Sequence, residues 1–263
     1  MQFTFDLISD LHLGPTDTFD WTGLATSPLC VVAGDISMDV EIVRETLEHL
    51  GQCYQAVFYI DGNNEHRYSL DSLTDSYNIL EEAIAGIDNV VFLQDNCVIV
   101  NNVAFIGSNG WWTYDLDQEI DDEQCRLWYC DIMDVGMPVT SAIHSMAYND
   151  AAYLSNSIKK LQTHPDVKSI VLVTHTVPNV ELIDHDMEIT STYKFNVMGN
   201  SIIPVVLDAD TENKVKTWCF GHYHNAIDQH QNGIRYVNNC RGRVEDSAVW
   251  TPPYYPKRIV VDV

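Results

Sequence analysis

The sequence predicts a layered α/β fold with a mixed sheet. Short apolar stretches rich in β-branched and aromatic residues recur along the chain, and each has the length of a strand. Helical patterns separate these stretches in the first half, whereas strand pairs occur in the middle and at the end. The expected strands are Phe3–Ile8, Leu29–Ala33, Ala56–Ile60, Val90–Leu93, Cys97–Val100, Val103–Gly107, Ser169–Thr174, Lys216–Phe220, Arg235–Val237 and Arg258–Val261.

Three segments between the strands show helical periodicity. Met38–Leu50 carries apolar side chains three or four positions apart, with Asp39 and Glu41 in its first turn. The segments Asp71–Ala85 and Met146–Leu161 have the same pattern. We therefore expect helices that cover the faces of the sheet.

One long segment, Ser108–Pro138, fits neither pattern. It contains the aromatic residues Trp111, Trp112 and Tyr114, followed by the acidic run Asp115–Glu123. Loops of this length inside a compact domain are usually functional or contain local structure. Because 263 residues are compatible with one α/β domain, we interpret the chain as a single domain, 1–263, with an insertion at about 108–138.

Composition excludes several classes of protein. The chain has 38 acidic and 14 basic side chains, a formal net charge of −24, which disfavours proteins that coat duplex nucleic acid or anionic membranes. A hydrophobic fraction of 46% excludes disorder as a description of the whole chain. The 7 cysteines are scattered without a CxxC motif, which is not typical of a secreted disulfide framework. No signal-like or membrane-spanning apolar run is found, so we expect a cytoplasmic protein without a membrane partner.

Polar side chains with metal-binding chemistry follow the predicted strands, at the point where each strand ends. The carboxyl ends of the strands are the edge at which open α/β sheets bind ligands. Neighbouring glycines at 34, 62 and 221 allow the chain to turn sharply there. These seven residues are Asp10, His12, Asp35, Asn63, His175, His222 and His224.

Carboxylate, imidazole and amide ligands without thiolate suit Mn²⁺, Fe or Zn²⁺. The set is too large for one tetrahedral ion and has about the size needed for two ions that share a ligand. Taken alone, an aspartate after a strand is usually a helix cap, and a lone histidine is usually structural. The ordered set of fragments favours a metal site, although the simpler interpretation remains open for each single member.

The ordered motifs resemble those of the calcineurin-like metallophosphoesterases. This resemblance implies a four-layer αββα sandwich, with two mixed β-sheets flanked by helices, and a dinuclear metal centre that hydrolyses phosphate esters. It places Asp10, His12, Asp35 and His224 on one ion. It places Asp35, Asn63, His175 and His222 on the other, with Asp35 as the bridging carboxylate. The motifs are Asp10-x-His12, Gly34-Asp35, Gly62-Asn63-x-Glu65, His175 and Gly221-His222-x-His224.

One position departs from this family pattern. Where the family usually has a histidine that assists catalysis beside the leaving group, this chain has Asn64. An amide can donate a hydrogen bond to a phosphoryl or leaving oxygen but cannot deliver a proton, a contribution of roughly 10²- to 10⁴-fold. His66 is the nearest replacement, and the alternative is that His66 is an exposed loop residue.

The resemblance also implies a mechanism and a substrate class. Two divalent ions, with Mn²⁺ expected to support activity in vitro, would hold a bridging hydroxide as the nucleophile. Arg67 and Arg241 are candidates for a phosphate clamp. Trp111 and Trp112 could stack on a nucleobase, or they could form a local hydrophobic cluster. With the acidic background, these features favour small phosphodiesters or nucleotides as substrates.

Two other functions remain to be tested. The protein could be a catalytically weakened scaffold that binds a protein partner, an alternative suggested by Asn64 and by the aromatic insertion. The intact set of seven candidate ligands argues against it. A nuclease acting on long nucleic acid is disfavoured by the net charge.

Overall fold

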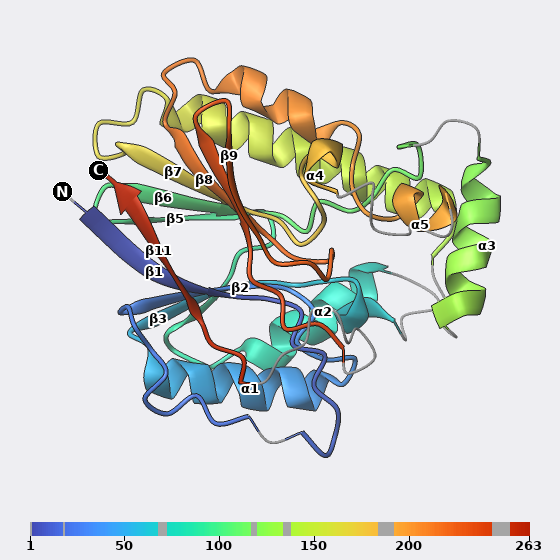
Figure 1. Ribbon diagram of the computed structural model, residues 1–263, viewed down its shortest axis with the longest axis horizontal. Helices are drawn as coiled ribbons and strands as arrows, with labels where there is room; N and C mark the ends of the chain where they lie inside the picture. The colour runs from blue at the N-terminus through green and yellow to red at the C-terminus, as the bar shows by residue number, and fades with distance from the viewer. Residues whose placement is uncertain are drawn as a thin grey trace.

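Two mixed β-sheets form the centre of the molecule in the computed structural model (Figure 1). The structure describes residues 2–17, 19–67, 73–116, 120–133, 138–183, 192–243 and 253–263. The first sheet has the strand order β11-β1-β2-β3-β4 and is parallel except for β11. Its strands are β1 (Gln2–Ile8), β2 (Leu29–Ala33), β3 (Ala56–Ile60), β4 (Val90–Phe92) and β11 (Lys257–Asp262).

The second sheet has the order β5-β6-β7-β8-β10-β9. Its central strands are parallel, and the edge strands β5 and β9 pair antiparallel with their neighbours. Both sheets are therefore mixed, as expected. The strands of the second sheet are β5 (Asn96–Val100), β6 (Val103–Gly107), β7 (Ser169–Val173), β8 (Val215–Phe220), β9 (Ile227–Gln231) and β10 (Ile234–Asn238).

Aliphatic side chains and four phenylalanines fill the space between the sheets. The ring of Phe105 on β6 lies 5.9, 5.2 and 4.8 Å from the rings of Phe3, Phe5 and Phe58 on the first sheet. The central strands β2, β6 and β7 are buried on both faces, which explains why they appear in the sequence as continuous apolar runs. This shared core fixes the position of the two sheets relative to each other.

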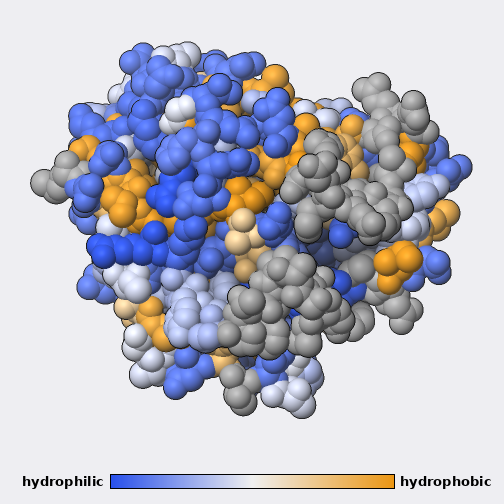
Figure 2. Space-filling view, viewed as in Figure 1, coloured by the Kyte–Doolittle hydropathy of each residue, from blue (hydrophilic) through white to orange (hydrophobic). Residues whose placement is uncertain are grey.

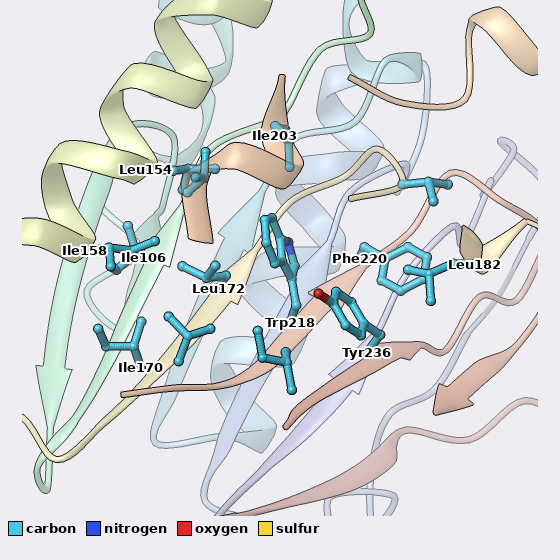
Figure 3. Close-up of a cluster of buried hydrophobic side chains, with 14 of the residues drawn as sticks. Ile106, Leu154, Ile158, Ile170, Leu172, Leu182, Ile203, Trp218, Phe220 and Tyr236 are labelled. Carbon is cyan, nitrogen blue, oxygen red and sulfur yellow. The ribbon is translucent and has the colours of Figure 1, made fainter. Parts of the chain in front are cut away.

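Helices cover the outer faces of the two sheets. Helix α1 (Val40–Cys53) and helix α2 (Leu73–Ile84) pack on the first sheet, and α1 begins after the cap residue Asp39, whose carboxylate accepts a hydrogen bond from the Glu41 amide. Helix α4 (Thr140–Leu161) and the 3-10 helix η3 (Ile203–Ala209) pack on the second sheet. Figure 3 shows Leu154 and Ile158 on the side of α4 that faces the sheet residues Ile106 and Leu172. The layered αββα arrangement is confirmed.

The segment 108–138 contains a helix that the sequence pattern did not indicate. Helix α3 (Asp122–Met133) stands at one end of the sandwich, beside the short helix α5 (Thr192–Asn196) (Figure 1). Residues 117–119 and 134–137 of the segment, including part of the acidic run, lie outside the described residues. Helix α4 begins at Thr140, six residues before the predicted start.

Among the coloured residues on the face in Figure 2, most are hydrophilic, and hydrophobic side chains appear in patches between them. Within the described ranges, no helix is both long and apolar enough to cross a membrane.

Candidate metal centre

The seven predicted residues come together at the carboxyl ends of β1, β2, β3, β7 and β8. Two groups of potential ligand atoms form there, and within each group the atoms lie within 4.8 Å of one another. Asp35 belongs to both groups. The first group is Asp10, His12, Asp35 and His224, and the second is Asp35, His175 and His222.

Asn63 joins the second group through its amide oxygen, which lies 3.1 Å from His175 Nε2. The spacing within both groups fits metal coordination. Ions bound at about 2.0–2.2 Å place neighbouring ligands about 2.8–3.6 Å apart in tetrahedral or octahedral geometry. His12 Nε2 lies 2.8 Å from His224 Nε2 and 3.6 Å from Asp35 Oδ2, and His175 Nε2 lies 3.3 Å from Asp35 Oδ1.

An unpaired carboxylate oxygen supports the same conclusion. Asp10 Oδ2 is buried and has no hydrogen-bond partner among the described residues, while Asp10 Oδ1 accepts from the His222 amide at 2.8 Å. A buried acceptor without a partner is costly unless a cation satisfies it. The donor set at this edge therefore fits a pair of divalent ions.

Backbone carbonyls set the tautomers of two histidines. His175 Nδ1 donates to the Ala33 carbonyl at 2.9 Å, and His222 Nε2 donates to the Val197 carbonyl at 2.8 Å. The other nitrogen of each ring then carries the lone pair and is available as a ligand. Burial lowers the pKa of His222 to about 3, and burial also lowers the pKa of His12 well below its ordinary value. Neutral imidazoles are the form that binds metal.

The backbone of the site adopts an uncommon conformation. Asp10, His12, Asp35 and His222 have φ values of 50°, 45°, 55° and 64°. Residues other than glycine rarely occupy this left-handed region, and such residues cluster at functional sites where surrounding structure holds them. Four of the candidate ligands therefore depend on the tertiary structure for their orientation.

Glu65 provides part of that support. Its carboxylate accepts hydrogen bonds from the backbone amides of Ile36 at 2.7 Å, Gly62 at 2.9 Å and Asp35 at 3.2 Å. One side chain thus ties the loop after β2 to the loop after β3. Because these loops carry Asp35 and Asn63, Glu65 positions both candidate ligands.

Comparison with solved structures identifies the fold. Phosphopantetheinyl hydrolase (PptH) from Mycobacterium tuberculosis superposes with a TM-score of 0.73 and 16% identity, over 98% of this chain and 96% of that protein. A putative 5'-nucleotidase from Staphylococcus aureus, solved with alpha-ketoglutarate, matches with a TM-score of 0.52 and 15% identity. That match covers all of this chain (100%) and 51% of the nucleotidase. Neither protein-family models nor curated protein sequences match the chain.

The chain has the calcineurin-like metallophosphoesterase fold. The sequence resemblance predicted this fold, and the paired sheets together with the structural neighbours confirm it. The candidate ligands follow the carboxyl ends of five strands that are far apart in the sequence.

Asn64 interacts mainly with Asp35. Its backbone amide donates to Asp35 Oδ1 at 2.9 Å, and its side-chain amide donates to Asp35 Oδ2. We expected the side-chain amide to point toward a phosphoryl or leaving oxygen. The structure instead directs it to the carboxylate shared by both ligand groups, because Asn64 opens the 3-10 helix η1 (Asn64–His66) directly beside Asp35.

His66 is not positioned to donate a proton to a substrate. Its Nε2 lies 2.8 Å from Asp61 Oδ2, its Nδ1 lies 2.7 Å from Ser76 Oγ, and the ring has no exposed surface. Both the proposed catalytic role and the alternative of an exposed loop residue are therefore corrected. His66 is the last residue of η1, and its ring links Asp61, in the loop after β3, to Ser76 on α2.

The two candidate clamp arginines are both buried. Arg241 Nη1 donates to the Leu11 carbonyl at 2.6 Å, so this guanidinium supports the loop between two candidate ligands and is not directed at an open site. Arg67 Nη1 lies 2.7 Å from the sulfur of Met38. Substrate binding by Arg67 remains a prediction.

Trp112 lies next to the candidate ligand His222 and Trp111 lies beside Trp112, but neither tryptophan ring has exposed surface. Trp112 packs parallel to the His222 ring at 5.6 Å, and Trp111 Nε1 donates to the Tyr77 hydroxyl at 2.9 Å. A buried ring offers no face to a nucleobase. The structure thus favours the alternative of an aromatic cluster and corrects the prediction of direct stacking.

We expect Trp112→Ala to lower the free energy of unfolding by about 3–5 kcal/mol, because a fully buried indole would leave a cavity. Urea titration measures this loss, and Trp128→Ala, which removes a partly buried ring of the same cluster, should cost less. Activity on a nucleotide and on a small aryl ester should fall together. A selective rise in KM for the nucleotide of about tenfold would instead indicate stacking.

Asp150 on α4 holds the loop that carries these tryptophans. Its Oδ2 accepts from the backbone amides of Gly110 at 2.8 Å and Trp111 at 3.0 Å. Burial raises the pKa of Asp150 to about 7, and the nearby charge of Asp95 adds to the effect. The folded protein therefore holds a proton there that the unfolded chain releases near pH 4.

This shift predicts a pH-dependent contribution to stability. Because the folded pKa exceeds the unfolded one, the contribution of Asp150 is complete below about pH 4 and is lost as the pH rises through about 7. We expect the free energy of unfolding of the wild type, relative to Asp150→Asn, to fall between about pH 4 and pH 7 and to level off above pH 7. Urea titrations of both proteins at each pH measure it, and a constant difference would contradict the assignment.

Sequence reasoning did not identify Tyr129 as part of the site. Its hydroxyl accepts a hydrogen bond from Asn63 Nδ2 at 2.8 Å, which turns the Asn63 oxygen toward His175. Burial raises the pKa of Tyr129. The only signal in the sequence is the aromatic-rich stretch around Trp128, which has no spacing that distinguishes a site residue from a packing residue.

Proposed function

We propose that this protein is a metal-dependent phosphoesterase that hydrolyses small phosphodiesters or nucleotides. The observation that carries the proposal is the pair of ligand groups that share Asp35. Asp10, His12 and His224 would complete one ion site, and Asn63, His175 and His222 the other. A fold shared with a phosphopantetheinyl hydrolase and a putative 5'-nucleotidase supports the same reaction class.

Mn²⁺, Fe or Zn²⁺ would supply Lewis acidity and an activated water at neutral pH. The residues of the chain would provide the remaining functions. His175 and His222 present oriented lone pairs, because backbone carbonyls hold their other nitrogens. Asn64 stabilises the charge of Asp35 through two hydrogen bonds.

The net charge supports the choice of a small substrate. At −24, the chain repels long polyanions, whereas two divalent ions would add positive charge only at the site. Duplex DNA and anionic membranes are therefore disfavoured as partners. A single phosphate ester would be attracted by the positive charge of the two ions and would approach only a small part of the acidic surface.

The test is hydrolysis of chromogenic phosphate monoesters and diesters after removal of metal with a chelator. We expect activity to return with Mn²⁺ and metal analysis to find two equivalents per chain. A protein that binds no Mn²⁺ and hydrolyses neither ester would contradict the proposal. A protein that binds two equivalents but lacks activity would favour the alternative of a catalytically weakened scaffold, which Asn64 suggests.

The asparagine at position 64 predicts a dependence on the leaving group. Without a proton donor there, rates should fall steeply as the pKa of the leaving alcohol rises, and Asn64→His should flatten this dependence. The measurement is kcat/KM for a series of aryl esters with each protein. A wild-type rate that does not vary along the series would show that another group already protonates the leaving oxygen.

A further inference from the structure

Helix α3 brings a polar group into the candidate metal centre. The Tyr129 ring packs against Trp112, with ring centroids 5.3 Å apart, and its side chain is almost fully buried. Only the hydroxyl end reaches a candidate ligand, Asn63. The segment between β6 and α4 thus contributes a hydroxyl to a site whose other residues come from strand ends.

The Tyr129 hydroxyl can still donate a hydrogen bond. A phenol can accept and donate, and Tyr129 accepts from Asn63 Nδ2 at 2.8 Å. Within the described part of the chain, the Tyr129 hydroxyl donates to no protein group. The neighbouring amide of Asn64 is directed to Asp35. Tyr129 therefore brings an unspent O–H donor to the second ligand group.

The surrounding charges suit an anionic ligand. The negative charge of Asp35 acts on the Tyr129 phenol, and the positive charges of Arg67 and Arg243 oppose it. The charge of Arg243 also acts on His12. Basic side chains are scarce in this protein, with 14 in all. Together with two divalent ions that would offset the charge of Asp35, these two guanidinium groups would favour a ligand with negative charge and several acceptor oxygens.

We propose that Tyr129 is a catalytic residue that donates a hydrogen bond to a phosphoryl oxygen of the substrate. The proposal rests on the proposed phosphoesterase function and adds a residue from the segment 108–138 to it. The phenol acts in its protonated form, which is the ordinary state of tyrosine at neutral pH. A hydrogen bond from a fixed donor strengthens as charge develops on the phosphoryl oxygens.

The test compares Tyr129→Phe with Tyr114→Phe. Phenylalanine keeps the ring that packs on Trp112 and removes only the hydroxyl. Tyr114 is buried in the same aromatic cluster and contacts Trp112 and His144, so it controls for the loss of a buried hydroxyl. Three quantities are measured: kcat on aryl phosphate esters, Mn²⁺ affinity by calorimetry, and orthophosphate affinity of the protein saturated with Mn²⁺.

We expect Tyr129→Phe to lower kcat on the order of 10²-fold and to weaken orthophosphate binding about tenfold. The loss in kcat should be the same for good and poor leaving groups, because the donor acts on the phosphoryl oxygens. Tyr114→Phe should change neither quantity by more than about twofold, because no candidate ligand contacts the Tyr114 hydroxyl among the hydrogen bonds of the described residues.

Two results would overturn the proposal while leaving the proposed function intact. Unchanged orthophosphate affinity at saturating Mn²⁺, together with weaker Mn²⁺ binding, would make Tyr129 a positioning residue that acts through Asn63. A loss in kcat that grows with leaving-group pKa would place the hydroxyl on the leaving oxygen. A wild-type protein that binds no Mn²⁺ and hydrolyses no ester would instead overturn the proposed function, and this inference with it.

Discussion

Asp35→Asn should abolish Mn²⁺-dependent hydrolysis, with a loss on the order of 10³-fold or more. The substitution keeps the size of the side chain and removes the charge shared by both ligand groups. His222 belongs to one ligand group only. His222→Ala should therefore also remove activity, while one equivalent of Mn²⁺ still binds. Calorimetric Mn²⁺ titration and ester hydrolysis measure both effects.

Control measurements separate loss of metal from loss of fold. His230→Ala removes an exposed imidazole on the edge strand β9 and should leave activity and Mn²⁺ binding unchanged. The far-UV circular dichroism of Asp35→Asn and His222→Ala should match that of the wild type. If Asp35→Asn bound two equivalents of Mn²⁺ and turned over normally, the assignment of the shared ligand would be wrong.

Gly62→Ala should be nearly as damaging, although it changes no candidate ligand. A Cβ at this position would lie 2.1 Å from Asp35 Oδ1 and 2.5 Å from the Asp35 backbone nitrogen. No rotamer relieves a clash with backbone, so the loops after β2 and β3 must separate. We expect a loss of activity of about 10²-fold, because misplacement of a reacting group by about 1 Å costs that much.

Gly14→Ala is the matched control for this substitution. Its Cβ would meet only Asp17 Oδ2, at 3.6 Å, which is ordinary van der Waals contact. The measurements are kcat/KM, the Mn²⁺ titration and the melting temperature of each variant. Equal activity in Gly62→Ala and Gly14→Ala would show that the close approach of the two loops is not required.

One strand, β9, was missed because most of its residues are polar. Strand β9 carries the polar residues Asp228, Gln229 and His230, which are partly or fully exposed. Hydrophobic periodicity cannot detect a strand in which only one residue, Ile227, is apolar. The pair Asn232-Gly233, both with positive φ, forms the turn to β10 and is the signal that could have revealed the hairpin.

The roles of individual polar residues near the site were harder to predict than its location. His66 lies one turn from Asn63 in the sequence, yet its ring points away from the ligands to Asp61 and Ser76. Local sequence does not determine the direction of a side chain in a short 3-10 helix. The burial of Trp112 depends on α3, whose position the sequence did not indicate.

The sequence by itself determined the layered fold class and the candidate ligands, because both follow from local order along the chain. Apolar runs of strand length specify buried strands, and residues directly after parallel strands lie at the carboxyl edge of their own sheet. The packing of the two sheets then brings the two edges together. Only the tertiary structure decided that Tyr129 enters the site and that Arg241 supports a loop. Those contacts join residues 66 and 230 positions apart in the chain. They depend on how separately folded elements pack, which no local pattern encodes.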